Sequence, residues 1–218
     1  MIWASAQGKV NLYFQVGDLQ PDGYHPVVSL YQALDLQERV GVEPSGAWEV
    51  RVVSDLPNLG EIPLDESNLV VKAAKTLAKF AGIENPQPMQ FEIQKQVPVA
   101  GGMAGGSADA AAALVALNEA WGLGLDQAEL MKVGGGIGAD VPFAILGGTA
   151  LGSDTGIELA ELALKDFGCG PGLLSGSGPT LWYLAADDKA AEVCAENIRA
   201  AGFQAVVANP SSAGSRLI

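Results

Sequence analysis

The most informative segment of the chain is rich in glycine and reads Pro98–Val99–Ala100–Gly101–Gly102–Met103–Ala104–Gly105–Gly106–Ser107–Ala108–Asp109–Ala110. Its four glycines let the backbone turn tightly and approach a ligand with no Cβ in the way. An alanine-rich helix is predicted from about Ser107 to Trp121, so the free N–H groups and the positive dipole end of that helix point at the segment. This combination predicts a binding site for an anion such as a phosphate group.

Two details of this segment leave alternatives open. It is not a Walker A loop, because no Lys-Ser or Lys-Thr pair follows the glycines. Ser107 either caps the helix or offers its hydroxyl to a phosphate or a metal ion. From the residues alone, a flexible turn before a buried alanine helix remains an alternative to an anion site.

Outward from this segment, apolar residues recur with the periods of strands and helices, which favours an α+β fold. In the first two thirds of the chain we expect strands at residues 10–14, 27–36, 48–53 and 91–97, and helices at residues 68–80, 107–121 and 126–133.

The segment 152–156 is the expected boundary between two domains, 1–152 and 153–218. Beyond it we expect a helix at 157–167, a glycine-rich turn at 168–178, a strand at 180–185, a helix at 189–201 and a strand at 204–208. The last strand–helix–strand unit resembles half of a ferredoxin-like sandwich.

The composition excludes several classes of function. The chain has 218 residues, of which 49% are hydrophobic and 17% charged, so it is globular, and its net charge of −13 makes a nucleic-acid partner or an anionic membrane unexpected. Two cysteines, Cys169 and Cys194, are too few for a disulfide framework or a structural zinc site. With no signal peptide and no apolar span recognised, the expected location is the cytoplasm.

Three segments in the same order resemble the motifs of the GHMP kinases, a family of ATP-dependent small-molecule kinases. The glycine-rich segment at 98–110 resembles their ATP-binding loop. Gly8–Lys9–Val10–Asn11–Leu12 resembles their N-terminal motif, and Leu174–Ser175–Gly176–Ser177–Gly178–Pro179–Thr180 resembles their C-terminal glycine motif. The resemblance implies an ATP-binding N-terminal domain of the ribosomal protein S5 domain 2-like kind and a ferredoxin-like C-terminal domain.

Two further segments narrow the resemblance to one branch of the family. Asp22–Gly23–Tyr24–His25 and Gly138–Ala139–Asp140–Val141–Pro142–Phe143 resemble the members that phosphorylate a hydroxyl of 4-diphosphocytidyl-2-C-methylerythritol in non-mevalonate isoprenoid synthesis. The implied partner is therefore a methylerythritol linked to cytidine diphosphate, and the protein is expected as a monomer or homodimer. Compared with that branch, the chain is short between residue 152 and the last motif, so the C-terminal domain is incomplete.

The resemblance assigns catalytic roles to Asp140 and Lys9. Asp140 would accept the proton of the attacking hydroxyl, and Lys9 would offset the charge that develops during phosphoryl transfer. On residue type alone, an aspartate such as Asp140 is more often a helix cap or turn residue than a base, and a lysine such as Lys9 is more often solvated. Asn11 shares the parity of Lys9 on a strand, so it is expected to face the same site as a substrate-binding residue.

The remaining implied contacts belong to ATP and to the acceptor. ATP, with Mg²⁺ as its expected counter-ion, would bind along residues 98–107 and Asp109. Tyr24 and His25 would recognise the cytidine end, and Ser175, Gly176, Ser177 and Gly178 would bring backbone amides to the substrate phosphates. His25 is the single histidine, so we expect no metal site built from protein ligands alone. Another GHMP kinase, acting on homoserine or a mevalonate-type alcohol, and a catalytically impaired nucleotide-binding remnant stay open as alternatives.

Overall fold

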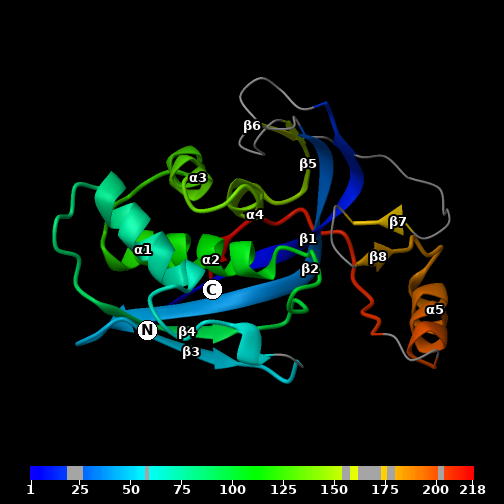
Figure 1. The fold of residues 1–218 in the computed structure, drawn as a ribbon, viewed down its shortest axis with the longest axis horizontal. Coiled ribbons are helices and arrows are strands. Elements are labelled where there is room, and N and C mark those ends of the chain that lie inside the picture. Colours follow the sequence, from blue (N-terminus) through cyan, green and yellow to red (C-terminus); the bar gives the residue numbers. More distant parts are fainter. Residues whose placement is uncertain (19–26, 57–58, 154–157, 162–172, 176–179, 201–203) are drawn as a thin grey trace.

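A computed structural model describes residues 1–18, 27–56, 59–153, 158–161, 173–175, 180–200 and 204–218. Figure 1 shows a long, curved sheet with helices gathered over one of its faces. A smaller group of elements from the last fifth of the chain lies beside one end of this sheet. None of the helices in these ranges is long and apolar enough to cross a bilayer.

The sheet is built on two long antiparallel strands, β1 (Ile2–Val16) and β2 (Val27–Pro44). The second half of β2 also pairs antiparallel with β4 (Met89–Gln94), and β4 pairs parallel with β3 (Glu49–Val53). All four strands were expected from the alternating pattern. β1 begins earlier than predicted because Ala4 to Asn11 are all buried, so this part of the strand lacks the alternating pattern by which a half-exposed strand is recognised.

The first half of β2 pairs with β5 (Thr149–Ser153), and β5 pairs in turn with β6 (Glu158–Glu161). The helix predicted at 157–167 is therefore wrong at Glu158–Glu161, because the open edge of β5 supplies backbone partners that override local helix propensity. The remainder of that prediction lies outside the described residues. At the far end of the chain, β9 (Arg216–Leu217) pairs with β1.

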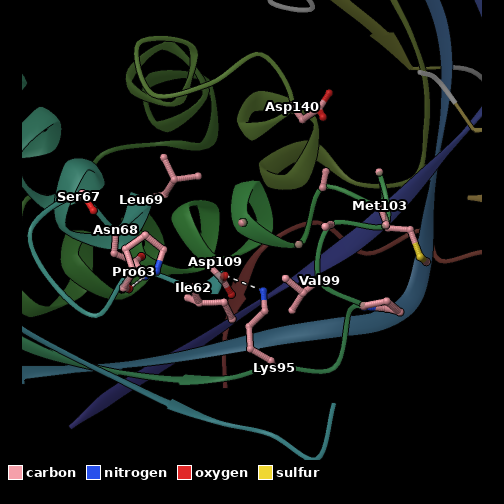
Figure 2. A pocket seen from close by; sticks show the side chains of 17 residues that line it. Ile62, Pro63, Ser67, Asn68, Leu69, Lys95, Val99, Met103, Asp109 and Asp140 are labelled. Atoms are coloured by element: carbon pink, nitrogen blue, oxygen red, sulfur yellow. Dashed lines mark hydrogen bonds and ion pairs between the residues drawn. The ribbon is translucent and has the colours of Figure 1, made fainter. Parts of the chain in front are cut away.

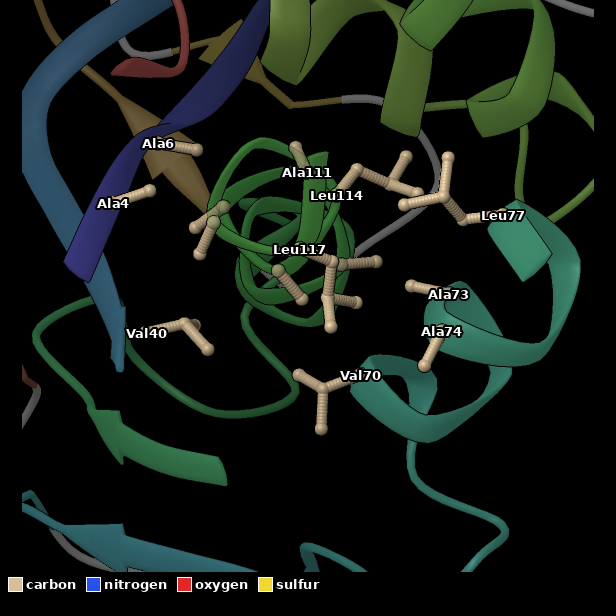
Figure 3. Close-up of a cluster of buried hydrophobic side chains, with 14 of the residues drawn as sticks. Ala4, Ala6, Val40, Val70, Ala73, Ala74, Leu77, Ala111, Leu114 and Leu117 are labelled. Carbon is tan, nitrogen blue, oxygen red and sulfur yellow. The ribbon is translucent and has the colours of Figure 1, made fainter. Parts of the chain in front are cut away.

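The core lies between this sheet and the helix α2 (Gly105–Ala120). Figure 3 shows α2 between the strands and a neighbouring helix, α1 (Leu69–Phe80), with Leu114 and Leu117 reaching between the layers. Alanines fill most of the buried positions of α2, so the helix approaches its neighbours closely. The predicted helix at 68–80 is confirmed, and the side chain of Asn68 caps it by accepting the N–H of Val70.

Two short helices complete the helical layer. The helix α3 (Gln127–Gly135) begins with a capping box between Asp126 and Glu129, as expected for an aspartate at this position. The helix α4 (Val141–Leu146) follows Asp140 and is buried at five of its six positions. It therefore places Asp140 at a fixed point beside the sheet.

The smaller group consists of β7 (Leu173–Leu174), β8 (Leu181–Trp182) and the helix α5 (Asp188–Ala200). α5 confirms the helix predicted at 189–201, whereas the strand predicted at 180–185 is limited to two residues. The strand predicted at 204–208 is wrong, since these residues form no regular structure. The guanidinium of Arg199 instead donates two hydrogen bonds to the carbonyl of Ala205, at 2.8 and 3.1 Å, and satisfies an oxygen that a strand partner would otherwise bind.

Candidate active site

The glycine-rich segment forms a loop between β4 and α2 whose backbone is partly left-handed. Ala100 and Ala104 have φ angles of 58° and 57°, and Gly102 has a φ angle of 71°. A left-handed conformation costs a residue with a Cβ about 1–2 kcal/mol, so the two alanines are held there by their surroundings. Strained backbone of this kind gathers at ligand sites, which supports the expected anion site.

The N-terminus of the helix α2 has no capping hydrogen bond from the side chain of its N-cap residue. Ala104 occupies the N-cap position and makes no side-chain capping bond. Ser107 lies within the first turn of the helix, so the alternative that Ser107 caps the helix is wrong. The uncapped N–H groups and the positive end of the helix dipole are therefore directed toward the loop.

A pocket of about 400 Å³ runs along this loop. Figure 2 shows Asp140 at one end of the pocket and Ile62 and Pro63 at the other. Its size is typical of a small-molecule site. Besides loop residues, the pocket is lined by Ile62, Pro63, Ser67, Asn68, Leu69, Lys95, Asp109 and Asp140.

Lys9 lies on β1 at the inner side of the loop and is 7% exposed. Its ammonium donates hydrogen bonds to the side-chain oxygen of Asn11 at 2.7 Å and to the carbonyl of Gly102 at 3.2 Å. The same ammonium lies 3.7 Å from a carboxylate oxygen of Asp140. Burial lowers the pKa of Lys9 below its ordinary value, and the charge of Asp140 opposes this shift. The solvated-lysine alternative is therefore wrong.

Asp140 stands at the N-cap position of α4, yet its side chain makes no capping hydrogen bond. The carboxylate turns instead toward Lys9 and remains partly open, with 31% of the side chain exposed. The capping alternative does not explain this orientation. An exposed carboxylate beside a buried ammonium at the end of a pocket can accept a proton from a bound hydroxyl.

Tyr31, on β2, is a site residue that the sequence analysis missed. Its ring lies 5.5 Å from the ammonium of Lys9 and stacks on Phe143 of α4, with ring centroids 5.0 Å apart. Burial, followed by the negative charge of Asp140, raises the pKa of Tyr31 to about 12. The face of the ring can stabilise the charge of Lys9. Its sequence context, an apolar strand, gave no sign of this role.

Asn11 joins β1 to the C-terminal glycine motif. The N–H of Asn11 donates to the hydroxyl of Ser175 at 3.0 Å, and the indole N–H of Trp182 donates to the carbonyl of Asn11 at 3.0 Å. The hydroxyl of Thr180 also bonds the carbonyl of Gly101 in the loop. Ser175 is thus brought to the site but is 1% exposed. The predicted residues Tyr24, His25, Gly176, Ser177 and Gly178 lie outside the described ranges.

Asp109 lies in the lining of the pocket predicted for ATP, and its carboxylate also belongs to an ion-pair network that the sequence analysis did not predict. Its carboxylate is buried and lies 2.8 Å from the ammonium of Lys95, which lies 2.8 Å from Glu38. Figure 2 shows Lys95 and Asp109 directed toward each other at the side of the pocket. Neither Glu38 nor Lys95 was predicted as a site residue.

Comparison with known proteins agrees with this geometry. Residues 68–148 match the family of GHMP kinases at its N-terminal domain. The chain belongs to the GHMP kinase family. This range contains the loop, α2 and Asp140, so the α+β class and the family expected from the motifs are both confirmed.

Two relatives show how far the similarity extends. The chain is 49% identical over 161 residues to a 4-diphosphocytidyl-2-C-methyl-D-erythritol kinase of Nocardia farcinica, which covers 74% of the chain and 51% of the relative. It is 48% identical over 155 residues to the kinase of the same name from Leifsonia xyli, with 71% and 50% covered. The chain thus spans about half the length of the curated relatives it matches.

Solved structures agree on the fold. A crystal structure of 4-(cytidine 5'-diphospho)-2C-methyl-D-erythritol kinase superposes with a TM-score of 0.71 at 23% identity and covers 99% of this chain and 97% of that one. A mevalonate kinase of Methanococcus jannaschii superposes with a TM-score of 0.52 at 15% identity and covers 74% and 55%. At these identities the structures establish the GHMP kinase fold.

Proposed function

We propose that this protein transfers the terminal phosphoryl group of ATP to a hydroxyl of 4-diphosphocytidyl-2-C-methylerythritol. The observation that carries this proposal is the pairing of Lys9 with Asp140 at one end of the pocket that the glycine-rich loop lines. The names of the two relatives described above support the choice of acceptor. We further propose that residues 1–152 bind the nucleotide and that residues 153–218 contribute to the acceptor side.

The pocket fits a nucleoside triphosphate in both shape and chemistry. Loop residues 98–106 and the uncapped first turn of α2 offer backbone N–H groups, which suit phosphate oxygens. Ile62, Pro63 and Leu69 line the other end and offer apolar surface for the adenine base. With the base there, the terminal phosphate is directed toward Lys9 and Asp140.

Mg²⁺ would accompany ATP in this proposal. Among the described residues, no three His, Cys, Asp or Glu side chains are grouped so that they could hold a metal ion. The phosphate oxygens would therefore supply most of the ligands, with the carboxylate of Asp140 as an oxygen donor of the chain in the pocket lining. When bound, the ion would neutralise part of the phosphate charge.

The chain's own contribution to chemistry follows from the Lys9–Asp140 pair. Asp140 accepts the proton of the attacking hydroxyl, so the oxygen becomes a better nucleophile as the bond to phosphorus forms. Lys9 is held between Asn11, Gly102 and Asp140, and its ammonium stabilises the negative charge that develops on the phosphoryl oxygens. No covalent enzyme intermediate is required.

The proposed binding site for the acceptor alcohol includes Asn11 and Ser175 among the described residues. Asn11 is fixed by Lys9, Ser175 and Trp182, which places it beside the reacting groups. We propose that Tyr24 and His25 bind the cytosine base, and that Ser175–Gly178 offer amides to the diphosphate. Ser175 is hydrogen-bonded to Asn11, and Asn11 is hydrogen-bonded to Lys9. A change in the position of Ser175 on substrate binding would therefore also change the position of Lys9.

Two alternative functions predict different results in a single assay of ADP release. A kinase for homoserine or a mevalonate-type alcohol would release ADP with those alcohols, and an impaired remnant would bind ATP without turnover. ADP release is measured with the full chain, ATP, Mg²⁺ and each of the three alcohols in turn. The proposal requires release with the cytidylated methylerythritol and little with the others. ATP binding without turnover on any of them would favour the remnant.

A further inference from the structure

Three buried ionisable side chains lie together beside the loop, and the proposed chemistry uses none of them directly. Glu38, Lys95 and Asp109 are 0%, 6% and 4% exposed. The ammonium of Lys95 lies 2.8 Å from a carboxylate oxygen of Glu38 and 2.8 Å from one of Asp109. We call these three residues the buried charge cluster.

The cluster joins three elements at the two ends of the loop. Glu38 belongs to β2 and accepts the backbone N–H groups of Gln96 at 3.1 Å and Val97 at 3.2 Å, directly before the loop starts. Lys95 precedes those two residues and reaches across to Asp109 in α2, after the loop has ended. The start and the end of the loop are therefore tied to each other and to the sheet.

The first residue of α2 rests on the same cluster. A Cβ added to Gly105 would lie 3.1 Å from Glu38 Oε1, 3.1 Å from Lys95 Nζ and 3.3 Å from Val97. These distances are shorter than ordinary van der Waals contacts, so α2 approaches the cluster as closely as a glycine permits. The position of the uncapped N–H groups of α2 thus depends on where the cluster lies.

Stability alone is a weak explanation for this arrangement. Taking charges out of water costs several kcal/mol per ion in proteins, and replacing a buried ion pair by neutral residues of similar volume is often neutral or stabilising. The cluster buries two carboxyl groups together with one ammonium, so each of the three groups has lost most of its contact with water. Burial, followed by the charge of Asp109, raises the pKa of Glu38. One oxygen of Asp109 has no hydrogen-bond partner, which also argues against a cluster optimised for stability.

We propose that the buried charge cluster of Glu38, Lys95 and Asp109 is a positioning device for the phosphate-binding loop. It holds the two ends of the loop at a fixed separation and fixes the distance between the sheet and the N-terminus of α2. The backbone N–H groups of the loop and of the first turn of α2 are therefore in position before a phosphate group binds. Lys95 and Asp109 also line the pocket, but the role proposed here for the three residues is to position the loop. This role rests on the proposed function only in that ATP is the ligand.

The experiment compares neutral variants that keep side-chain volume. In the triple variant Glu38→Gln, Lys95→Met, Asp109→Asn, all three charges are removed together, so no unpaired charge is left buried. The control is Glu66→Gln with Lys75→Met, which neutralises an exposed ion pair on α1 and the segment before it. Asp109→Asn alone serves if the triple variant does not fold, since it leaves Glu38 and Lys95 as a balanced pair.

Two readouts are taken on the full chain at a temperature where each variant is folded. Amide hydrogen exchange of residues 96–108 reports the loop without any ligand, and calorimetry reports the affinity for ATP. We expect exchange in this range to rise at least about tenfold and ATP affinity to fall at least about tenfold, with both unchanged in the control. Folded variants with exchange at 96–108 equal to that of the parent would overturn the proposal. If the parent itself fails to bind ATP, the proposed function is contradicted, while the exchange result still decides the role of the cluster.

Discussion

The ammonium of Lys9 on β1 and the carboxylate of Asp140 before α4 lie 3.7 Å apart, where the helical layer meets the sheet. Lys9 is nearly buried, whereas Asp140 is partly open to the pocket. The pair therefore combines a cation held in place by Asn11 and Gly102 with a carboxylate that a ligand can reach. This asymmetry suits the phosphoryl transfer to an alcohol that is proposed above.

The ring of Tyr31 is expected to support Lys9 without taking part in proton transfer. Tyr31→Phe keeps the ring but removes the hydroxyl, whose interaction with Asp140 contributes to the raised pKa of Tyr31, so turnover should fall less than in Tyr31→Leu. Tyr31→Leu removes the ring face, worth about 0.5–2 kcal/mol to a neighbouring cation, and should lower turnover about tenfold with a smaller effect on KM for ATP.

Steady-state kinetics on both variants would check this expectation. A matched control is Phe80→Leu, because the ring of Phe80 lies 6.0 Å from Lys132 on the helical surface and away from the pocket. Equal losses in Tyr31→Phe and Tyr31→Leu would mean that the hydroxyl rather than the ring matters.

The buried charge cluster should leave its mark on the pH dependence of stability. Burial and the charge of Asp109 raise the pKa of Glu38 to about 8, from an ordinary value of 4.5. Between these values the folded state binds more protons than the unfolded state, so the free energy of unfolding falls as pH rises from about 5 to about 8. In Glu38→Gln this contribution is absent, and the dependence should be flatter.

Urea denaturation of the parent and of Glu38→Gln across that pH range measures the difference. Glu66→Gln, which removes an exposed carboxylate paired with Lys75, is the control and should follow the parent. Parallel curves for the parent and Glu38→Gln would show that Glu38 does not exchange a proton in this window.

The sequence predicted the part of the site that is contiguous in the chain. The glycine-rich loop, the helix after it and the aspartate before α4 are local patterns, and each was found where expected. Tyr31 was missed because an aromatic residue in an apolar strand is ordinary core, and its position under Lys9 depends on how two strands pair.

The sequence of β2 and β4 contains a pattern that indicates the buried charge cluster. On β2 the residues Val42, Val40 and Glu38 alternate on one face, and on β4 Phe91 and Ile93 are followed at the same parity by Lys95. A charged residue that continues an apolar period-two pattern is placed in the interior and needs a partner. Asp109 was expected to bind ATP together with the loop, and it does line the pocket, but its carboxylate also turns inward to Lys95 from a buried helical position.

A side chain at Gly105 is expected to disturb the buried charge cluster. This effect is distinct from a direct collision between the side chain and a bound phosphate group. The Cβ of an alanine there would point into the protein, toward Glu38 and Lys95. Gly105→Ala should therefore lower both the melting temperature and the affinity for ATP, the latter about tenfold or more. Calorimetry and a melting curve test this, and a variant with lower ATP affinity but the parent's melting temperature would point back to a direct clash with the ligand.

A substitution at His25 is expected to change the KM for the acceptor but not the KM for ATP. Because His25 is proposed to bind only the cytosine base, His25→Ala should raise KM for the cytidylated acceptor at least about tenfold and leave KM for ATP within about twofold. Steady-state kinetics with each substrate varied in turn gives both values. Equal losses for the two substrates would assign His25 a structural role instead.

The central claim is that Asp140 acts as the base opposite Lys9, and turnover of Asp140→Asn tests it most directly. Asparagine keeps the shape of the side chain, and no capping bond is lost because Asp140 makes none. The measurement is ADP release from ATP and 4-diphosphocytidyl-2-C-methylerythritol by parent and variant, with ATP affinity measured alongside. The account predicts that turnover falls at least about 10²-fold while ATP affinity stays within about threefold. Turnover by Asp140→Asn equal to that of the parent would contradict it.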